Sequence, residues 1–347
     1  MIPSWKKFLS GYGAAFDDSA VKDFGDPLAE GRAPSSAGVI CDLSHRGLIA
    51  VKGDDAFNFL QGQLTCDLRE VSPARSRLAA WCTPKGRVLV LFRVVHADKG
   101  FLLELPASLR GAILGRLRMY VLRARVSLEE VSDGYVRIGL AGNSATEVIE
   151  SLYGSAPRSA DEVATSGDTR LIRLHGGVPR YQVIGDAKGA EALWRVAAQT
   201  LTPAGQRIWS LLEIFAGVPE ITHGDQHLPQ MINLDVLDGL SFNKGCYVGQ
   251  EIVARSHYLG RVKRRMYLIG AGVGDQPPPG TPIVDATSGA EAGQIVTSAA
   301  RGDADGIAAL AVLRIDATRT DALHLGSTEG PRVELLDSPY SLADEFE

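Results

Sequence analysis

Short apolar runs and amphipathic segments follow one another along most of the chain, and their lengths predict strands mixed with helices. In the first part, apolar runs of strand length lie at 38–43, 46–53, 78–83, 87–95, 101–105 and 124–131. Between them, apolar residues recur at helical spacing over 57–64 and 109–120, and Asp54 and Asp55 supply a helix start for the former. Because strands and helices do not alternate strictly, the pattern favours an α+β fold over a doubly wound sheet.

A second stretch repeats this order of strands and helices. Ser144 and Glu147 have the spacing of a capping box, which predicts a helix that ends at Gly154. Strands are predicted at 135–142, 171–176 and 180–185, and helices at 187–199 and 208–215. We therefore expect two similar α+β units, one after the other along the chain.

The last part of the chain changes to short β runs separated by turn-forming clusters. The runs cover 266–272, 281–286, 292–299 and 306–315, at the spacing of hairpins, which predicts a small β-barrel or sandwich. The first residues are polar, and the last ones, from 337, are expected to form a frayed acidic tail. The predicted segments are an N-terminal arm 1–37, a first α+β unit 38–132, a second α+β unit with the cysteine motif 133–258, and a β-barrel 259–340.

Residues 243–255, NKGCYVGQEIVAR, hold the strongest chemical signal in the sequence. Cys246 stands between Gly245 and Gly249, and glycine allows the tight turns that present a side chain to solvent. The following segment has helical character, and a helix N-terminus favours an anion. We interpret Cys246 as a reactive thiolate that Lys244 helps to hold ionised. The alternative is an inert buried cysteine, which the flanking glycines and lysine disfavour.

The run KGCYVGQE resembles the signature of the YgfZ family of folate-binding proteins, relatives of the glycine-cleavage T-protein, an aminomethyltransferase. Three other stretches resemble that family in the same order along the chain: DDAFNFLQGQLTCDL, CTPKGRVLVLFRV and GRVKRRMYLIG. The likeness extends from Gly38 to the C-terminus. It implies a T-protein-like fold, in which two related α+β units form a folate pocket and a small C-terminal β-barrel follows.

The resemblance also implies roles for individual residues. In the T-protein relatives a glutamate in a run similar to IWSLLEIFAG contacts the folate pterin ring, and Glu213 matches it. A carboxylate can accept paired hydrogen bonds from the 2-amino group and ring N–H of a pterin. The alternative is an exposed glutamate on a helix face. Arginines of the basic run 261–265 would be partners for the folate glutamate tail. Further cofactor contacts are expected from Tyr247, Gln250, Glu251 and Arg255.

The function implied by the resemblance is a tetrahydrofolate-binding accessory protein in iron–sulfur cluster assembly or repair, and indirectly in tRNA modification. Its partners would be folate and iron–sulfur proteins or their assembly factors, without direct contact to nucleic acid. The first alternative is a folate-dependent aminomethyltransferase, but T-proteins have a catalytic carboxylate where Leu89 and Val90 stand, and these cannot handle a proton. Another alternative is an enzyme that uses Cys246 as a covalent nucleophile, with His257 or His45 approaching in space.

Composition narrows the classes of partner and compartment. The chain has 347 residues, enough for two or three domains, and its net charge of −5 is atypical of a general nucleic-acid binder. The four cysteines show no CxxC spacing, which predicts no zinc or iron–sulfur ligand set and fits a reducing compartment. Cys41 and Cys82 fall in apolar runs of strand length, which predicts that they belong to the core. Gly224 interrupts the pair His223 and His227, so we expect solvated loop histidines and no metal. Without an apolar run of membrane-spanning length, we expect a cytoplasmic protein with no membrane partner.

Overall fold

The computed structural model of the chain describes residues 1–18, 20–224, 226–258, 262–302 and 306–342. Contacts between residues group the chain into two compact units. Unit 1 comprises residues 1–60, 68–77 and 92–209, and unit 2 comprises residues 61–67, 78–91 and 210–347. Unit 2 is therefore built from three stretches that are separated in the sequence. The four consecutive segments expected from the sequence remain a prediction.

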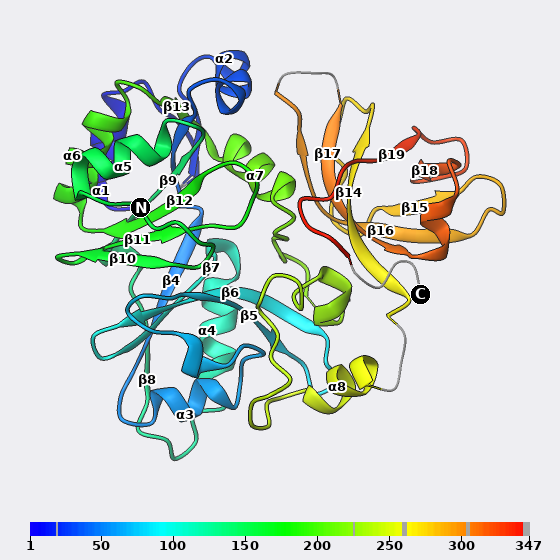
Figure 1. The fold of residues 1–347 in the computed structure, drawn as a ribbon, viewed down its shortest axis with the longest axis horizontal. Coiled ribbons are helices and arrows are strands. Elements are labelled where there is room, and N and C mark those ends of the chain that lie inside the picture. The colour runs from blue at the N-terminus through cyan, green and yellow to red at the C-terminus, as the bar shows by residue number, and fades with distance from the viewer. Residues whose placement is uncertain (19, 225, 259–261, 303–305, 343–347) are drawn as a thin grey trace. The chain divides into compact units, whose positions relative to one another are not determined.

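A six-stranded sheet covered by helices forms the centre of unit 1. Within the described residues its strand order is β10 (Val163–Ser166), β11 (Thr169–Arg173), β12 (Arg180–Gly185), β9 (Val136–Ala141), β3 (Val39–Asp42) and β13 (Thr202–Ala204). Helices α5 (Ala145–Tyr153) and α6 (Ala187–Ala197) lie beside this sheet (Figure 1). Apolar residues of both helices, including Ile149 and Trp194, share one core with Ile138 and Val183 of the strands.

Strand β3 joins the sheet formed by later parts of the chain. It pairs antiparallel with β9 and parallel with β13. The sequence placed this strand in the first α+β unit, because its nearest neighbours along the chain are there. Beneath the sheet, a Cβ atom at Gly139 would come within 2.4 Å of the Trp209 ring, so this position of β9 requires glycine.

The N-terminal residues expected to form a polar arm contain regular structure and contribute to the core of unit 1. Helix α1 (Pro3–Ser10) buries Trp5 and Leu9, and the Trp5 indole N–H donates a 2.7 Å hydrogen bond to the Asp42 carboxylate. The segment is polar on average, yet Trp5, Phe8 and Leu9 have the spacing of one helix face. It continues with strands β1 (Ala15–Asp17) and β2 (Ala20–Asp23) and helix α2 (Pro27–Arg32).

Unit 1 also buries a cluster of charges around Asp161. This residue is fully buried and has a left-handed φ of 67°. Its carboxylate pairs with Arg93 at 2.5 Å and lies 3.3 Å from the His175 ring. Burial by itself would raise the pKa of Asp161, but the charge of Arg93 and the hydrogen bond from His175 outweigh it and hold the pKa at about 2. The carboxylate is therefore ionised at neutral pH.

A five-stranded sheet includes residues of both units. Within the described chain its order is β5 (Arg77–Cys82), β6 (Val88–Ala97), β7 (Gly100–Pro106), β4 (Arg46–Lys52) and β8 (Ser127–Glu130). Helix α4 (Arg110–Arg118) packs against β4 and β8 through Ile113, Leu114 and Leu117, the face predicted from its spacing. Helix α3 (Ala56–Gln61) lies where the run after Asp54 and Asp55 predicted it.

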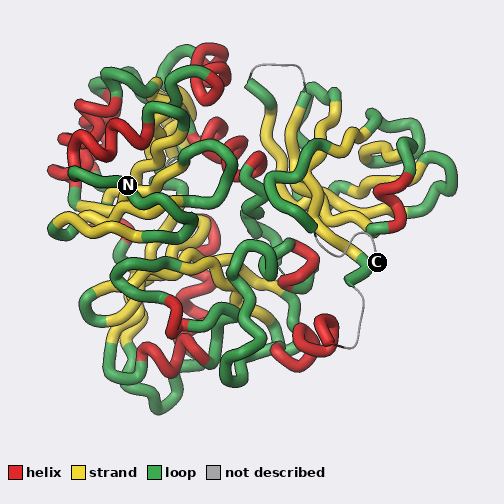
Figure 2. Tube along the Cα trace, in the orientation of Figure 1, coloured by secondary structure: helices red, strands yellow, loops and turns green. Residues whose placement is uncertain are grey.

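The C-terminal part of unit 2 is a six-stranded antiparallel sheet, as the short β runs predicted. Its order in the described residues is β18 (Leu323–Leu325), β15 (Pro282–Asp285), β16 (Glu291–Ala300), β17 (Ile307–Arg314), β14 (Arg264–Ala271) and β19 (Val333–Leu335). A bridge between His324 and Arg332 brings its edges together, so the sheet curls into a nearly closed barrel (Figure 2). Along β17, Ala309 and Ala311 face the barrel core, whereas Ala308 and Leu310 belong to the main core of unit 2.

The remaining α-helices of the described residues are α7 (Gln206–Phe215) and α8 (Gln250–Tyr258). Short 3-10 helices cover Ala33–Ser35, Leu68–Glu70, Ala107–Leu109, Ser132–Gly134, Pro229–Ile232 and Asp316–Arg319.

The described part of the predicted frayed tail packs against other residues of unit 2. The Tyr340 hydroxyl donates to the Gly217 carbonyl at 2.9 Å and accepts from Asn233 at 3.2 Å. Burial raises the pKa of Tyr340 to about 12, so the hydroxyl keeps its proton. For residues 337–342 the prediction failed, because the Tyr340 hydroxyl has partners in unit 2 that the composition did not reveal. The acidic end of the tail, 343–347, lies outside the described residues.

Candidate functional site

The cysteine motif forms a loop followed by helix α8, as the sequence predicted. The helix begins at Gln250, and Cys246 lies in the loop just before it with an exposed side chain. On either side of the cysteine, Lys244 and Tyr247 are buried, with 8% and 6% of their surfaces exposed. The loop is therefore anchored by its buried neighbours and presents the thiol to solvent.

Gly249 anchors the loop against the turn between β5 and β6. Its φ is +84°, and a Cβ atom there would lie 2.5 Å from the Thr83 carbonyl oxygen and 2.8 Å from Cα of Gly86. Both the backbone angle and the space exclude a side chain. Gly245, by contrast, has open space around its Cα. The glycine after Cys246 is thus required by packing, and the turn at Thr83–Gly86 is the surface on which it packs.

Lys244 holds the loop to a distant stretch of the chain. Its ammonium group donates to the carbonyl oxygens of Leu64 and Cys66 at 2.7 and 2.6 Å, and it lies 5.2 Å from the centre of the Tyr247 ring. A buried ammonium needs such acceptors because burying an unpaired charge is costly. The sequence suggested that this cation acts on the Cys246 thiol. That role remains a prediction, whereas the carbonyl contacts give Lys244 a structural role that the sequence did not reveal.

Two further motif residues predicted to bind the cofactor have local roles in the structure. The Gln250 side chain accepts a 3.2 Å hydrogen bond from the Tyr247 backbone N–H, which closes the loop onto the first turn of α8. The Tyr247 hydroxyl is buried with no hydrogen-bond partner among the described residues, and burial raises its pKa. Glu251 and Arg255 have exposed side chains on α8. Their assignment to a cofactor remains a prediction.

The four cysteines, all of which lie in described residues, differ sharply in accessibility. Cys41, Cys66 and Cys82 are buried, with at most 2% of their surfaces exposed, and Cys246 is exposed. Burial raises the pKa of Cys41 well above its ordinary value and that of Cys82 to about 12. The predicted assignment of Cys41 and Cys82 to the core is confirmed. Cys246 is the thiol that an external reagent can reach in the folded chain.

Glu213 occupies the position on α7 that the periodicity predicted. It is half-buried between the buried Leu212 and Ile214, and its backbone carbonyl accepts from the Val218 N–H at 3.0 Å. Beyond the helix, Gly217 has a φ of +67°, and a Cβ there would meet the Tyr340 ring at 2.5 Å. Gly217, four residues beyond Glu213 and just after the end of α7, therefore packs against Tyr340 of the C-terminal segment.

Leu89 and Val90, which the resemblance places where a T-protein would have its catalytic carboxylate, both lie on β6. Val90 is fully buried, and Leu89 is half-buried at the start of β6. The backbone of Gly224 lies so close to this strand that a Cβ would be 2.6 Å from the Leu89 carbonyl oxygen. Gly224 and His227 thus pack directly on β6, and the Val88 N–H donates to the His227 carbonyl at 2.9 Å.

Several surface expectations differ from the structure. His223 is exposed, as expected of a loop, but His227 is buried, with 7% of its surface exposed. In the basic run, Arg261 lies outside the described residues. Arg265, expected as a partner for the folate glutamate tail, is buried in an ion pair with Asp235 at 2.8 Å. The described residues contain no group of three or more His, Cys, Asp and Glu placed to hold a metal. His257, considered as a base for Cys246, stacks on Phe242 with ring centres 3.9 Å apart.

Known proteins resemble this chain in sequence and in fold. Residues 22–174 match the family model described as the GCVT N-terminal domain. The tRNA-modifying protein YgfZ of Colwellia psychrerythraea is 35% identical over 235 residues, which cover 67% of this chain and 71% of that protein. The tRNA-modifying protein YgfZ of Sodalis glossinidius is 30% identical over 310 residues, 88% of this chain and 94% of its own length.

The glycine cleavage system aminomethyltransferase T from Bartonella henselae has the same fold, with a TM-score of 0.73 over 97% of each chain and 17% identity. The predicted T-protein-like α+β fold with a C-terminal β-barrel is therefore confirmed. Among the described residues, no helix has the length and apolar character needed to cross a membrane. The motif, the fold and the curated relatives agree, and the chain belongs to the YgfZ family.

Proposed function

We propose that this protein binds a reduced folate and uses Cys246 in the assembly or repair of iron–sulfur proteins that serve tRNA modification. The observation that carries the proposal is an exposed thiol on a loop pinned by Lys244 and Gly249, while the other three cysteines are buried. Relatives at 30–35% identity have the name tRNA-modifying protein. The partners in this proposal are folate and iron–sulfur proteins or their assembly factors.

The folate part of the proposal rests on Glu213. A half-buried carboxylate on a mainly buried helix suits a pterin, because apolar walls cover the ring while the carboxylate accepts its paired N–H groups. Tetrahydrofolate would be held there by Glu213. When bound, it would supply a reduced pterin, and this chain would contribute the carboxylate and the accessible thiol.

Aminomethyl transfer is the disfavoured function despite the shared fold. Such transfer needs a carboxylate near the reacting nitrogen, and general acid–base help of this kind is worth about 10²–10⁴ in rate. Val90 and Leu89 offer no group that can exchange a proton. A shared fold at 17% identity does not imply that the two proteins catalyse the same reaction.

The cysteine role is tested by complementation. In cells that lack the endogenous homologue, the wild-type protein should restore the activity of iron–sulfur enzymes, and Cys246→Ala should restore less. Cys82→Ala is the control, because it removes a thiol that is buried. Equal rescue by wild type and Cys246→Ala, at equal protein level, would refute the role of the thiol. Rescue of a T-protein deletion would show that the chain supplies the missing carboxylate elsewhere.

The folate role is tested by titration calorimetry with tetrahydrofolate. Losing a charged hydrogen-bond partner costs about 1.5–3 kcal/mol, so Glu213→Gln should bind roughly ten- to a hundred-fold more weakly. Glu147→Gln, an exposed glutamate on α5, is the matched control. Equal affinity of wild type and Glu213→Gln would remove Glu213 from the folate site.

A further inference from the structure

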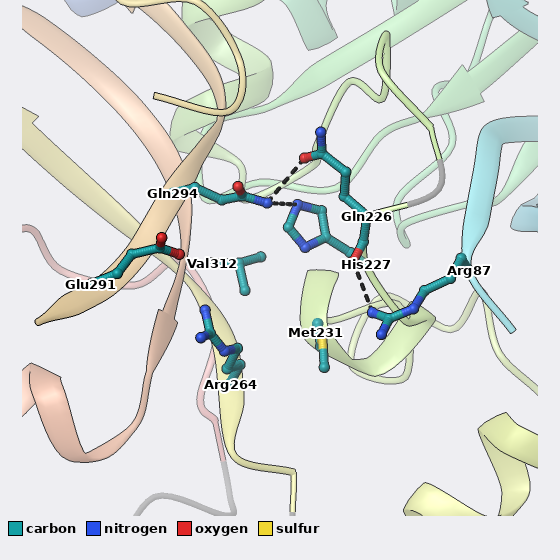
Figure 3. Close-up of a pocket in the computed structure, with 8 residues that line it drawn as sticks. All are labelled: Arg87, Gln226, His227, Met231, Arg264, Glu291, Gln294 and Val312. Atoms are coloured by element: carbon teal, nitrogen blue, oxygen red, sulfur yellow. Dashed lines mark hydrogen bonds between the residues drawn. The ribbon is translucent and has the colours of Figure 1, made fainter. Parts of the chain in front are cut away.

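A polar pocket of about 250 Å³ lies in unit 2, outside the cysteine motif (Figure 3). It is formed by the start of β6, the segment 226–231 and barrel strands β14, β16 and β17. Its lining residues are Arg87, Gln226, His227, Met231, Arg264, Glu291, Gln294 and Val312. Neither the proposed thiol chemistry nor the pterin carboxylate uses this pocket.

Hydrogen bonds fix one wall of the pocket. The Gln294 amide donates to the Gln226 side-chain oxygen at 3.0 Å and lies 3.3 Å from Nε2 of His227 (Figure 3). Since the amide N–H₂ is a donor, Nε2 accepts, and the neutral imidazole has its proton on Nδ1. Arg87 donates to the Gln226 carbonyl at 2.8 Å. These polar groups are thus held in place before any ligand arrives.

The charges in the pocket are not balanced within the protein. Two guanidinium groups, Arg87 and Arg264, and one carboxylate, Glu291, line it. In the described part of the chain, no ion pair joins these arginines to a carboxylate. Burial, followed by the charges of the two arginines, lowers the pKa of His227 to about 4, so its imidazole is neutral at pH 7.

We propose that this pocket binds an amino-carboxylate, with the ligand carboxylate on Arg87 and Arg264 and its ammonium or amide N–H on Glu291. Guanidinium groups match the geometry of a carboxylate. Glu291 disfavours a dianion such as phosphate and favours a ligand that also has a donor. At about 30 Å³ for each water-sized group, the pocket holds roughly eight non-hydrogen atoms of a ligand. Such a group occurs in a free amino acid and in the glutamate part of a folate.

Calorimetric titration of the full chain with three probes tests this proposal. L-glutamate should bind saturably, while glutarate, which lacks the amine, and inorganic phosphate should each bind at least about ten-fold more weakly. Glu291→Gln should remove the preference for L-glutamate over glutarate. No saturable binding of L-glutamate, or the same preference in Glu291→Gln, would overturn the proposal.

A matched pair of variants distinguishes a direct contact between Arg264 and the ligand from an effect of the protein's net charge. Arg264→Gln should weaken L-glutamate binding at least about ten-fold. Lys263→Gln removes the same charge from the adjacent, exposed residue and should bind as wild type does. Equal affinity of Arg264→Gln and Lys263→Gln would overturn the proposal.

Competition identifies the source of the amino-carboxylate. Displacement of L-glutamate by tetrahydrofolate would support the glutamate part of folate as the ligand, and simultaneous binding would support a separate amino acid. The proposal does not rest on the pterin site. Suppose that Glu213→Gln binds folate with wild-type affinity while Arg264→Gln no longer binds L-glutamate. The assignment of Glu213 to the folate site would then be wrong, and the amino-carboxylate pocket would be supported.

Discussion

At the scale of single residues, side chains of the same type differ in burial in ways that the sequence alone does not show. The four cysteines have similar apolar or glycine-rich surroundings in the sequence, but one side chain reaches solvent. The sequence predicted Cys246 as the exposed thiol from its glycines, and it predicted Cys41 and Cys82 as core. It could not predict the contacts of Lys244, because the carbonyl acceptors at Leu64 and Cys66 are 180 and 178 residues away, more than half the chain.

The accessibility of the thiols leads to a labelling prediction. With iodoacetamide at pH 8, Cys246 should be alkylated at least about 100-fold faster than the buried cysteines, because these require local opening that costs roughly 3 kcal/mol or more. Peptide mass spectrometry over time measures the order of modification, and urea-unfolded protein is the control in which all four should react. Faster labelling of Cys41, Cys66 or Cys82 in the folded chain would contradict this prediction.

The Asp161 cluster leads to a pH prediction. The folded pKa of about 2 lies below the ordinary value of an aspartate, so the ion pair stabilises the fold fully above pH 4 and is lost as the pH falls toward 2. Asp161→Asn leaves Arg93 buried without its partner and should lower the free energy of unfolding by about 3 kcal/mol at pH 7. Urea unfolding at pH 7, 4 and 3 should show this difference shrinking at acid pH. The control is Asp168→Asn in an exposed turn, and a pH-independent difference would count against the ion pair.

At the scale of elements, local pattern predicted helices and strands well and their ends less well. Helix α5 ends at Gly154 with a left-handed φ of 81°, as predicted, but Ser144 makes no side-chain capping hydrogen bond. Helix α6 has a cap that was not predicted, in which the Asp186 carboxylate accepts from the Gly189 N–H. Caps depend on backbone angles, and the sequence spacing of Ser144 and Glu147 does not fix those angles.

The contact between the motif loop and the β5–β6 turn predicts different effects for two glycine substitutions. Gly249→Ala should destabilise the protein by about 1–3 kcal/mol, because alanine is strained at a φ of +84° and its Cβ meets the Thr83 carbonyl. Gly245→Ala, where a Cβ meets nothing within 4 Å, should change stability by less than about 0.5 kcal/mol. Urea denaturation compares the two variants. Equal effects would mean that the loop does not depend on this close approach.

At the scale of the whole molecule, the sequence predicted the fold class, and the compact units join segments that are far apart in the sequence. Strand pairing is set by contacts between distant segments, so hydrophobic periodicity identifies β3 as a strand without naming β9 and β13 as its partners. In the same way, the residues 61–67 and 78–91 belong to unit 2 although unit 1 residues surround them in the sequence. The resemblance to a known family supplied what periodicity could not, namely the T-protein-like architecture.

This division predicts the behaviour of an isolated barrel. Barrel residues Met266, Leu310 and Val312 share the main core of unit 2 with Leu78 and Leu234, which lie outside the barrel. A fragment 262–347 would expose that apolar face and should aggregate or lack a cooperative thermal transition, whereas the full chain should show one. Circular dichroism and size-exclusion chromatography of both proteins measure this. A monomeric, cooperatively folding fragment would show that the barrel is independent of the rest of unit 2.

Unit 2 is built from three separate stretches of the chain, and this determines when its core can form during synthesis on the ribosome. Residues 61–67 and 78–91 leave the exit tunnel long before the segment 210–258 that completes their core. At about 5–20 residues per second, the interval is roughly ten seconds or more. During that time Leu78, Ala80 and Val88 lack the neighbours that bury them in the finished protein. A nascent chain of this protein therefore offers chaperones apolar strand residues for about half of its synthesis, and slow translation prolongs that exposure.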